Sequence, residues 1–215
     1  MSKENEKIII NCVKKIAKQN HFKTISNCIY KTDGNLVIYA VVWATDNHTI
    51  AFRWCIKTIE LDDIFWDIFD MSDNKNERFS LRIEGAFCCP SYIFDEKVCE
   101  VENMERLEEI VGSFFLSEMK KVEEYTNNIR AEYGDFLSYI IKREDAYDLT
   151  KLLAHILLGE YEYVYKIVKS ELKRGENGGF GNKGKNIYQY MEEYCRRKIR
   201  NKKIGFRSKI KNLKK

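Results

Sequence analysis

An acid-x-lysine pattern is the arrangement in this sequence that comes closest to a catalytic one. Asp95 and Lys97 are separated by one residue in a segment with strand-like alternation, and Glu84 is an acid upstream of them. In some metal-dependent nucleases carboxylates hold Mg²⁺ and such a lysine assists the attacking water. Because 33% of the residues are charged, short patterns of this kind also arise by chance, and a solvent-facing strand edge is the alternative interpretation. Metal-dependent nuclease activity is therefore one alternative function, with Asp95, Lys97 and Glu84 as candidate catalytic residues.

A glycine-rich segment at residues 179–186 nearly matches the phosphate-binding loop G-x-x-x-x-G-K-[ST]. Asn186 stands where that loop has the hydroxyl that binds Mg²⁺, and the segment before it has a helical pattern where the loop requires a strand. Only residues 187–215 would remain to complete a nucleotide-binding fold. We therefore expect a solvated turn here and no nucleotide cofactor.

Cysteine and histidine spacing gives no pattern typical of a metal site. Cys88 and Cys89 are adjacent, which prevents the geometry of a C-x-x-C pair, and the three histidines are scattered. Most of the seven cysteines lie in apolar stretches, where a free thiol packs as a small hydrophobic group. The sequence thus predicts no bound metal and a reducing, cytoplasmic environment.

The last twenty residues carry the strongest charge signal in the chain. They contain eleven Lys or Arg and no acid, which leaves 26 basic and 33 acidic residues in 1–195, a balance of −7. Such a segment can bind nucleic-acid phosphates, an anionic membrane surface, an acidic protein or the acidic part of its own chain. Ile199, Phe206, Ile210 and Leu213 recur at spacings that permit an amphipathic helix. The candidate contact residues are Arg196, Arg197, Lys198, Arg200, Lys202, Lys203, Arg207, Lys209 and Lys211.

Hydrophobic periodicity divides the chain into strands followed by helices, which is the α+β pattern. The expected strands are residues 25–30, 36–43, 49–59, 78–87 and 92–101, and the expected helices are residues 4–19, 64–69, 104–125, 136–143, 147–158, 161–173 and 187–198. Asp33-Gly34-Asn35 is a strong hairpin signal between the first two strands. We expect an antiparallel sheet of about five strands with flanking helices, followed by a helical C-terminal region.

The expected domains are an α+β domain at 1–130, a helical hairpin with a terminal helix at 131–195, and a basic tail at 196–215. The longest apolar runs, residues 36–44 and 110–116, are far shorter than the roughly 20 residues of a transmembrane helix. Aromatic residues such as Trp43, Trp54 and Trp66 are expected in the core. Tyr161, Tyr163 and Tyr165 cannot all lie on one buried helix face, so at least one should be exposed.

The order of elements near the N-terminus resembles a known family. An opening helix ends near Asn20-His21-Phe22-Lys23, a strand carries Tyr30, and a hairpin leads to a strand with Phe52 and Trp54. Over about residues 5–125 this resembles the bacterial domain-of-unknown-function family number 4304. The resemblance implies a small α+β protein, some of whose relatives have suspected immunity or interaction roles beside bacterial toxins, and it implies no catalytic residues.

The sequence therefore leaves three functions open. The first is a non-enzymatic, cytoplasmic protein-binding module, immunity-like toward a bacterial toxin, whose acidic part suits a basic partner. The second is a nucleic-acid-associated protein that binds through its basic tail. The third is the metal-dependent nuclease.

Overall fold

The computed structural model describes residues 3–45 and 49–212, apart from the side chains of 3, 84 and 205–212. Internal contacts divide the chain into two compact units, each formed by two separate stretches of sequence. Unit 1 comprises Met1–Ile59 and Ser91–Tyr139, and unit 2 comprises Glu60–Pro90 and Ile140–Lys215. This division differs from the consecutive ranges expected from the sequence, because residues 60–90 group with the C-terminal helices.

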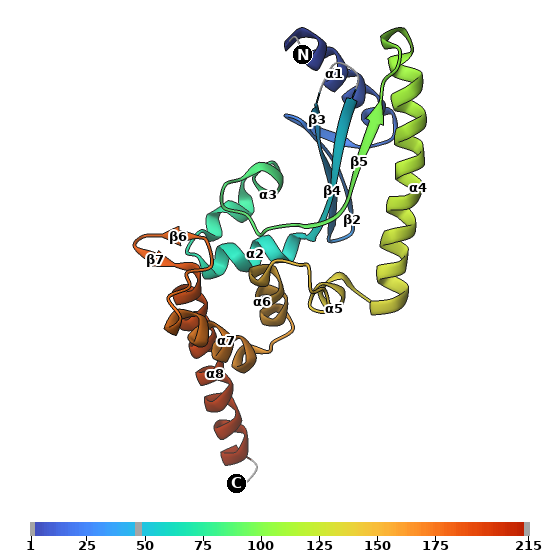
Figure 1. Ribbon diagram of the computed structural model, residues 1–215. Coiled ribbons are helices and arrows are strands. Elements are labelled where there is room, and N and C mark those ends of the chain that lie inside the picture. The colour runs from blue at the N-terminus through green and yellow to red at the C-terminus, as the bar shows by residue number, and fades with distance from the viewer. Residues whose placement is uncertain (1–2, 46–48, 213–215) are drawn as a thin grey trace. The chain divides into compact units, whose positions relative to one another are not determined.

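Unit 1 is built on a five-stranded antiparallel sheet, which confirms the expected α+β class (Figure 1). The strands lie in chain order and are β1 (Lys23–Ile25), β2 (Cys28–Asp33), β3 (Leu36–Ala44), β4 (Thr49–Thr58) and β5 (Tyr92–Glu100). The predicted hairpin joins β2 to β3, with Asp33 opposite Leu36. Gly34 occupies the turn with a φ of 57°, a conformation that favours glycine. The expected turn at residues 46–48 lies outside the described residues.

Two long helices pack in unit 1. They are α1 (Lys3–Gln19) and α4 (Leu107–Tyr133), which follows the short 3-10 helix η2 (Met104–Arg106). The helices pack against each other, and α1 also packs on β3. Phe22, Trp54 and Phe115 form an aromatic cluster in the core, with ring centroids 5.5–6.5 Å apart. Each of these side chains is at most 4% exposed.

One predicted strand is wrong. Residues Leu81–Glu84 form the helix α3, and β5 pairs with β4 where a strand at 78–87 was expected. Side-chain contacts within unit 2 outweigh the short alternating pattern: Arg82 donates to Asp63 at 2.8 Å and its guanidinium lies 4.7 Å from the ring centroid of Trp66. The sheet still has five strands, because residues 23–25 form β1.

The strand β4 also differs from expectation. Its alternating sequence predicts one wet face, but side chains on both faces are buried, with Trp54 fully buried and Cys55 4% exposed. Lys57, on the face expected to be wet, is fully buried. The alternating polar positions of β4 are therefore no guide to solvent exposure.

Unit 2 is helical, with one two-stranded hairpin. Its elements are α2 (Ile59–Ile68), η1 (Ser72–Asn76), α3, α6 (Asp148–Leu157), α7 (Tyr161–Lys173), β6 (Gly181–Asn182), β7 (Lys185–Asn186) and α8 (Ile187–Asn212). The short helix α5 (Phe136–Ile140) lies where the sequence passes from unit 1 to unit 2. α6 and α7 form the expected helical hairpin around Gly159, whose φ is 80°, and α7 packs along α8.

The core of unit 2 is rich in aromatic rings. Phe65, Phe69, Phe180 and Tyr190 contact one another with centroid separations of 5.2–5.3 Å. α2 begins five residues before the predicted helix start, and Asp62 is consequently buried inside it, where it accepts the backbone N–H of Cys89 at 2.9 Å. Across the described residues, no helix combines the length and apolar composition that crossing a bilayer requires.

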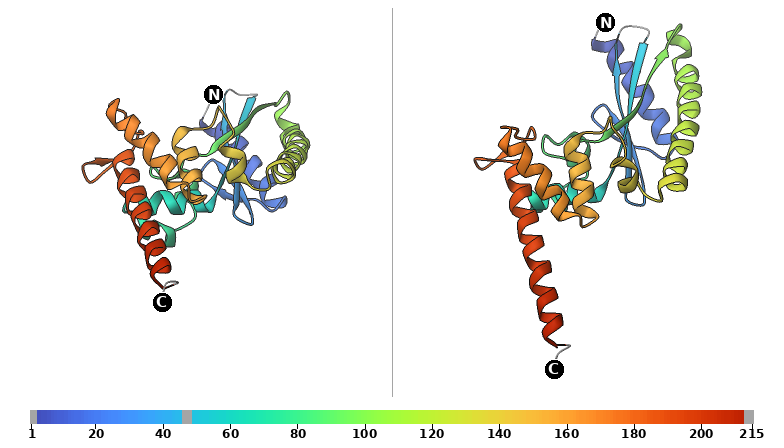
Figure 2. Two further views of the ribbon diagram at one scale, coloured as in Figure 1. Left: turned by 90° about the horizontal axis from the view of Figure 1, so that it is seen from below. Right: turned by 60° about the horizontal axis from the view of Figure 1, so that its bottom comes forward.

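The basic tail is part of a helix. The sequence predicts a helix that ends near residue 198, but α8 continues to Asn212. Figure 2 shows α8 extending beyond the other helices of its unit. Residues 196–212 are therefore presented on a continuous helical backbone.

Candidate functional site

The C-terminal half of α8 is exposed because only its first half is anchored. Ile187, Met191 and Cys195 are fully buried in the core of unit 2. From Arg200 to Ile204 every side chain is exposed. The anchored turns extend the helix into solvent, and lysines and arginines near its C-terminus are favourable for the helix dipole.

Cations follow one face of this exposed helix. Arg196, Arg200 and Lys203 are spaced by four and three residues, which places them on the same side of an α-helix. The same spacing continues to Arg207 and Lys211, whose side chains, like that of Lys209, lie outside the described residues. At 1.5 Å per residue the positions 196–211 span about 22 Å. We call these five positions the cationic row.

The chain's own carboxylates leave most of this charge unpaired. Within residues 196–204, all described, Arg196 alone has an acidic partner, Glu192 at 2.6 Å. Arg197 and Lys198 lie over the ring of Tyr194, at 5.5 and 5.1 Å from its centroid. Their positive charge is thus available to an external anion.

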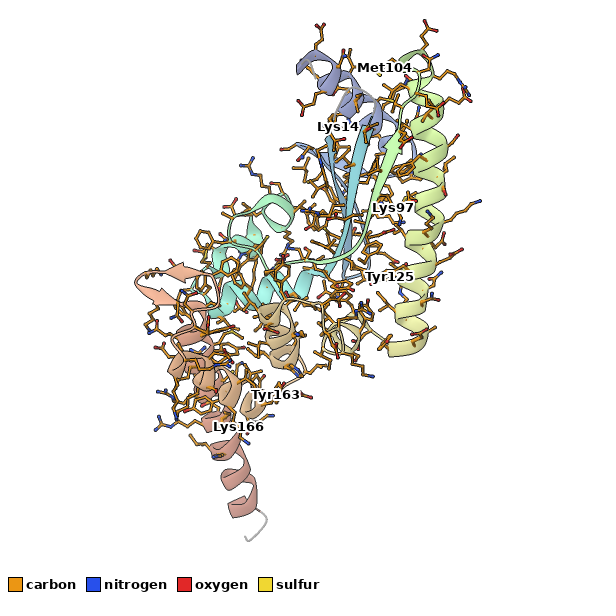
Figure 3. The ribbon with its side chains drawn as sticks, viewed as in Figure 1. Lys14, Lys97, Met104, Tyr125, Tyr163 and Lys166 are labelled. Atoms are coloured by element: carbon orange, nitrogen blue, oxygen red, sulfur yellow. The ribbon has the colours of Figure 1, made fainter. Side chains whose placement is uncertain are left out.

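Tyrosines support the first part of the exposed segment. Lys202 lies 5.1 Å from the ring centroid of Tyr161, and its ammonium donates to the carbonyl of Gly159 at 3.2 Å. The rings of Tyr161 and Tyr194 meet edge to face at 6.5 Å. Tyr163 of α7 is 49% exposed (Figure 3), which confirms that at least one of the three spaced tyrosines is exposed. The pairing of Tyr161 with Lys202 was not predictable from local spacing, because 41 residues separate them.

The candidate nuclease residues are only partly brought together. Asp95 and Lys97 form an ion pair on β5 at 3.0 Å, with side chains 28% and 41% exposed. Glu84 ends α3 in the other unit, and its side chain is outside the described residues. In the described part of the chain, His, Cys, Asp and Glu form no group of three suited to a metal ion. The nuclease function stays a prediction.

The cysteines pack as hydrophobic groups. All seven thiols are free, and every one but Cys88 is buried. Burial raises the pKa of Cys55 to about 11 and that of Cys195 to about 12. Those two thiols therefore stay protonated near neutral pH, the form that neither binds metals nor attacks electrophiles.

The segment that resembles a phosphate-binding loop forms the expected turn. β6 and β7 pair in a hairpin with Lys183 and Gly184 at its tip, both at positive φ. The N-terminus of α8 is capped by reciprocal 2.9 Å hydrogen bonds between the backbone and side chains of Asn186 and Gln189. Because these caps satisfy first-turn donors, the helix start differs from a phosphate cradle.

A second exposed surface lies on the sheet of unit 1. The guanidinium of Arg53 donates to Glu96 at 2.5 Å and lies 5.4 Å from the ring centroid of Trp43. Arg53 is directly opposite Glu96, and Ala51 stands between Trp43 and Val98 in neighbouring strands. Val98 is 55% exposed. We call Trp43, Arg53, Glu96 and Val98 the sheet patch.

Comparisons with known proteins add no relative: no protein-family model, curated protein or solved structure matches this chain. The resemblance to family 4304 consequently stays a prediction. The function has to be argued from the geometry of α8 and of the sheet patch.

Proposed function

We propose that the protein binds nucleic acid through the C-terminal half of α8, by contacts to the phosphate backbone. The observation that carries the proposal is the exposed cationic row, of which only Arg196 is neutralised by an acid within the described residues. Lysines and arginines that neutralise phosphates release condensed counterions, and this release supplies the affinity of sequence-independent binding.

The distribution of charge favours nucleic acid over a membrane surface. A helix in a membrane interface keeps one broad face apolar. In residues 196–204 only Ile199 and Ile204 are apolar, and Arg197, Arg200, Lys202 and Lys203 place exposed cations around most of the helix. An α-helix is about 10–12 Å wide and the major groove of B-form DNA about 12 Å, with phosphates along both walls. Duplex DNA is therefore the substrate class that we propose.

Protein binding is the second candidate function, and the sheet patch favours it. Trp and Arg dominate binding energy at protein interfaces, and Trp43 and Arg53 lie together beside the exposed Val98. The −7 balance of residues 1–195 suits a basic partner. This candidate includes the immunity-like role that the resemblance to family 4304 implies. For either function we propose a cytoplasmic location, which the free thiols support.

One purification experiment separates the two candidates. Full-length protein, an Arg200→Glu/Lys203→Glu variant and a Trp43→Ala variant are purified gently from cells, with and without nuclease, and analysed by absorbance ratio and mass spectrometry. We expect nucleic acid with the wild type and with Trp43→Ala, and its loss from the double variant. A stoichiometric protein that survives nuclease and disappears with Trp43→Ala would instead support the sheet patch and contradict the first proposal.

A further inference from the structure

Unit 2 contains a pocket of about 200 Å³ between α6 and α7, to which the first turn of α8 also contributes. Leu152 and Ile167 supply apolar sides, while Glu171 and Tyr188 supply polar groups. Pockets for drug-sized ligands measure about 300–1,000 Å³, so this one suits a small, unbranched group. The pocket is separate from the exposed half of α8.

Tyr188 is the group in the pocket that most needs a ligand. Its residue is only 8% exposed, and within the described structure its hydroxyl has no hydrogen-bond partner. A buried hydroxyl without a partner is unfavourable. The pKa of Tyr188 is raised by burial and then by the charges of Glu171 and Asp148. The phenol therefore stays protonated and can donate to or accept from a guest.

The charges around Tyr188 select the sign of that guest. Glu171 is 20% exposed and lies beside Tyr188, while its partner Arg174 is 66% exposed and so reaches toward solvent. Asp148 also lines the pocket and pairs with Lys151 at 2.9 Å. The nearby carboxylates together outweigh Arg174, the one cation that lowers the pKa of Tyr188. A cation is favoured at this end.

The other end of the pocket is aromatic. His155 accepts or donates through Nδ1 to Glu160 at 2.6 Å, and its ring lies 4.5 Å from that of Tyr163. Between this pair and Glu171 lie Leu152 and Ile167, which present hydrocarbon. The pocket therefore combines a carboxylate end with an apolar floor.

We propose that this pocket binds a primary alkylammonium group, with the ammonium between Glu171 and the Tyr188 hydroxyl and the alkyl chain along Leu152 and Ile167. A free polyamine and the lysine side chain of a peptide share this chemistry. Charge-assisted hydrogen bonds to a largely buried carboxylate give the site its preference for a cation over a neutral alcohol.

Calorimetric titration of the full-length protein tests the site. The probes are 1,4-diaminobutane, N-acetyl-lysine methylamide and, as a neutral control, 1-butanol. We expect saturable binding of an amine, weakened about tenfold by Glu171→Gln through loss of the charged hydrogen bond. Tyr188→Phe should weaken it several-fold. Glu162→Gln, an exposed acid of α7 that does not line the pocket, should leave it unchanged.

The outcomes are distinct from those of the nucleic-acid proposal. Arg200→Glu/Lys203→Glu should leave amine binding intact, because those cations lie outside the pocket. Binding of the diamine alone identifies a free polyamine as the source, and binding of the lysine amide as well identifies a side chain. Absence of saturable heat with both amines, or equal affinities for Glu171→Gln and Glu162→Gln, would overturn the assignment.

Discussion

Replacing Arg200, Lys203 and Arg207 with glutamate is expected to weaken binding of duplex DNA by about a thousandfold at low salt. Each substitution removes one cation of the row and introduces a charge that phosphates repel. A hydrogen bond to a charged group contributes about 1.5 kcal/mol or more, and about 1.4 kcal/mol corresponds to tenfold in affinity. Fluorescence anisotropy of a labelled duplex of about 20 base pairs measures the effect.

A matched control carries the same change in net charge elsewhere. Lys7, Lys18 and Lys120 are exposed on α1 and α4 of unit 1, and their replacement by glutamate should weaken binding less than tenfold. Circular dichroism establishes that both triple variants keep their helices. Equal losses in the two variants would mean that overall charge, and not α8, attracts the nucleic acid.

Trp54→Ala is expected to destabilise unit 1 by about 3–5 kcal/mol. The indole is fully buried between Phe22 and Phe115, so truncation leaves a cavity in the aromatic cluster. Because folded domains are stable by only about 5–15 kcal/mol, the variant should be close to unfolding at 37 °C. The measurement is the free energy of unfolding in urea, followed by circular dichroism.

Two further tryptophan variants sharpen this result. Within the described structure the Nε1 of Trp54 is buried without a hydrogen-bond partner, so Trp54→Phe removes an unsatisfied donor and should cost clearly less than Trp54→Ala. Trp43→Ala, in the half-exposed sheet patch, should change stability by about 1 kcal/mol. A loss for Trp43→Ala as large as that for Trp54→Ala would show that the cluster is not the main support of the unit.

Local patterns predicted most of the elements, and they failed where distant contacts decide. The Asp33-Gly34-Asn35 signal gave the correct hairpin because turn chemistry depends on neighbouring residues only. The alternation of Phe79, Leu81 and Ile83 suggested a strand, but the contacts of Arg82 with Asp63 and Trp66 stabilise a helical turn there. Propensity over so few residues is easily overridden by packing.

The functional surfaces were predictable to different degrees. The cations of α8 are evident from composition, whereas their alignment depends on a helix that continues to Asn212 through Gly205. The amine pocket was missed, because Leu152, Glu171 and Tyr188 belong to three helices and have no shared spacing. Such a site exists only once the helices have packed.

The salt dependence of DNA binding tests the central claim most directly. If the five positions of the cationic row contact phosphates, the logarithm of the binding constant should fall with the logarithm of salt concentration with a slope of about −4.5. Arg200→Gln/Lys203→Gln should reduce that slope by about 2, and Lys18→Gln/Lys120→Gln should leave it unchanged. A slope near zero, or the same slope in all three proteins, would contradict phosphate binding by α8.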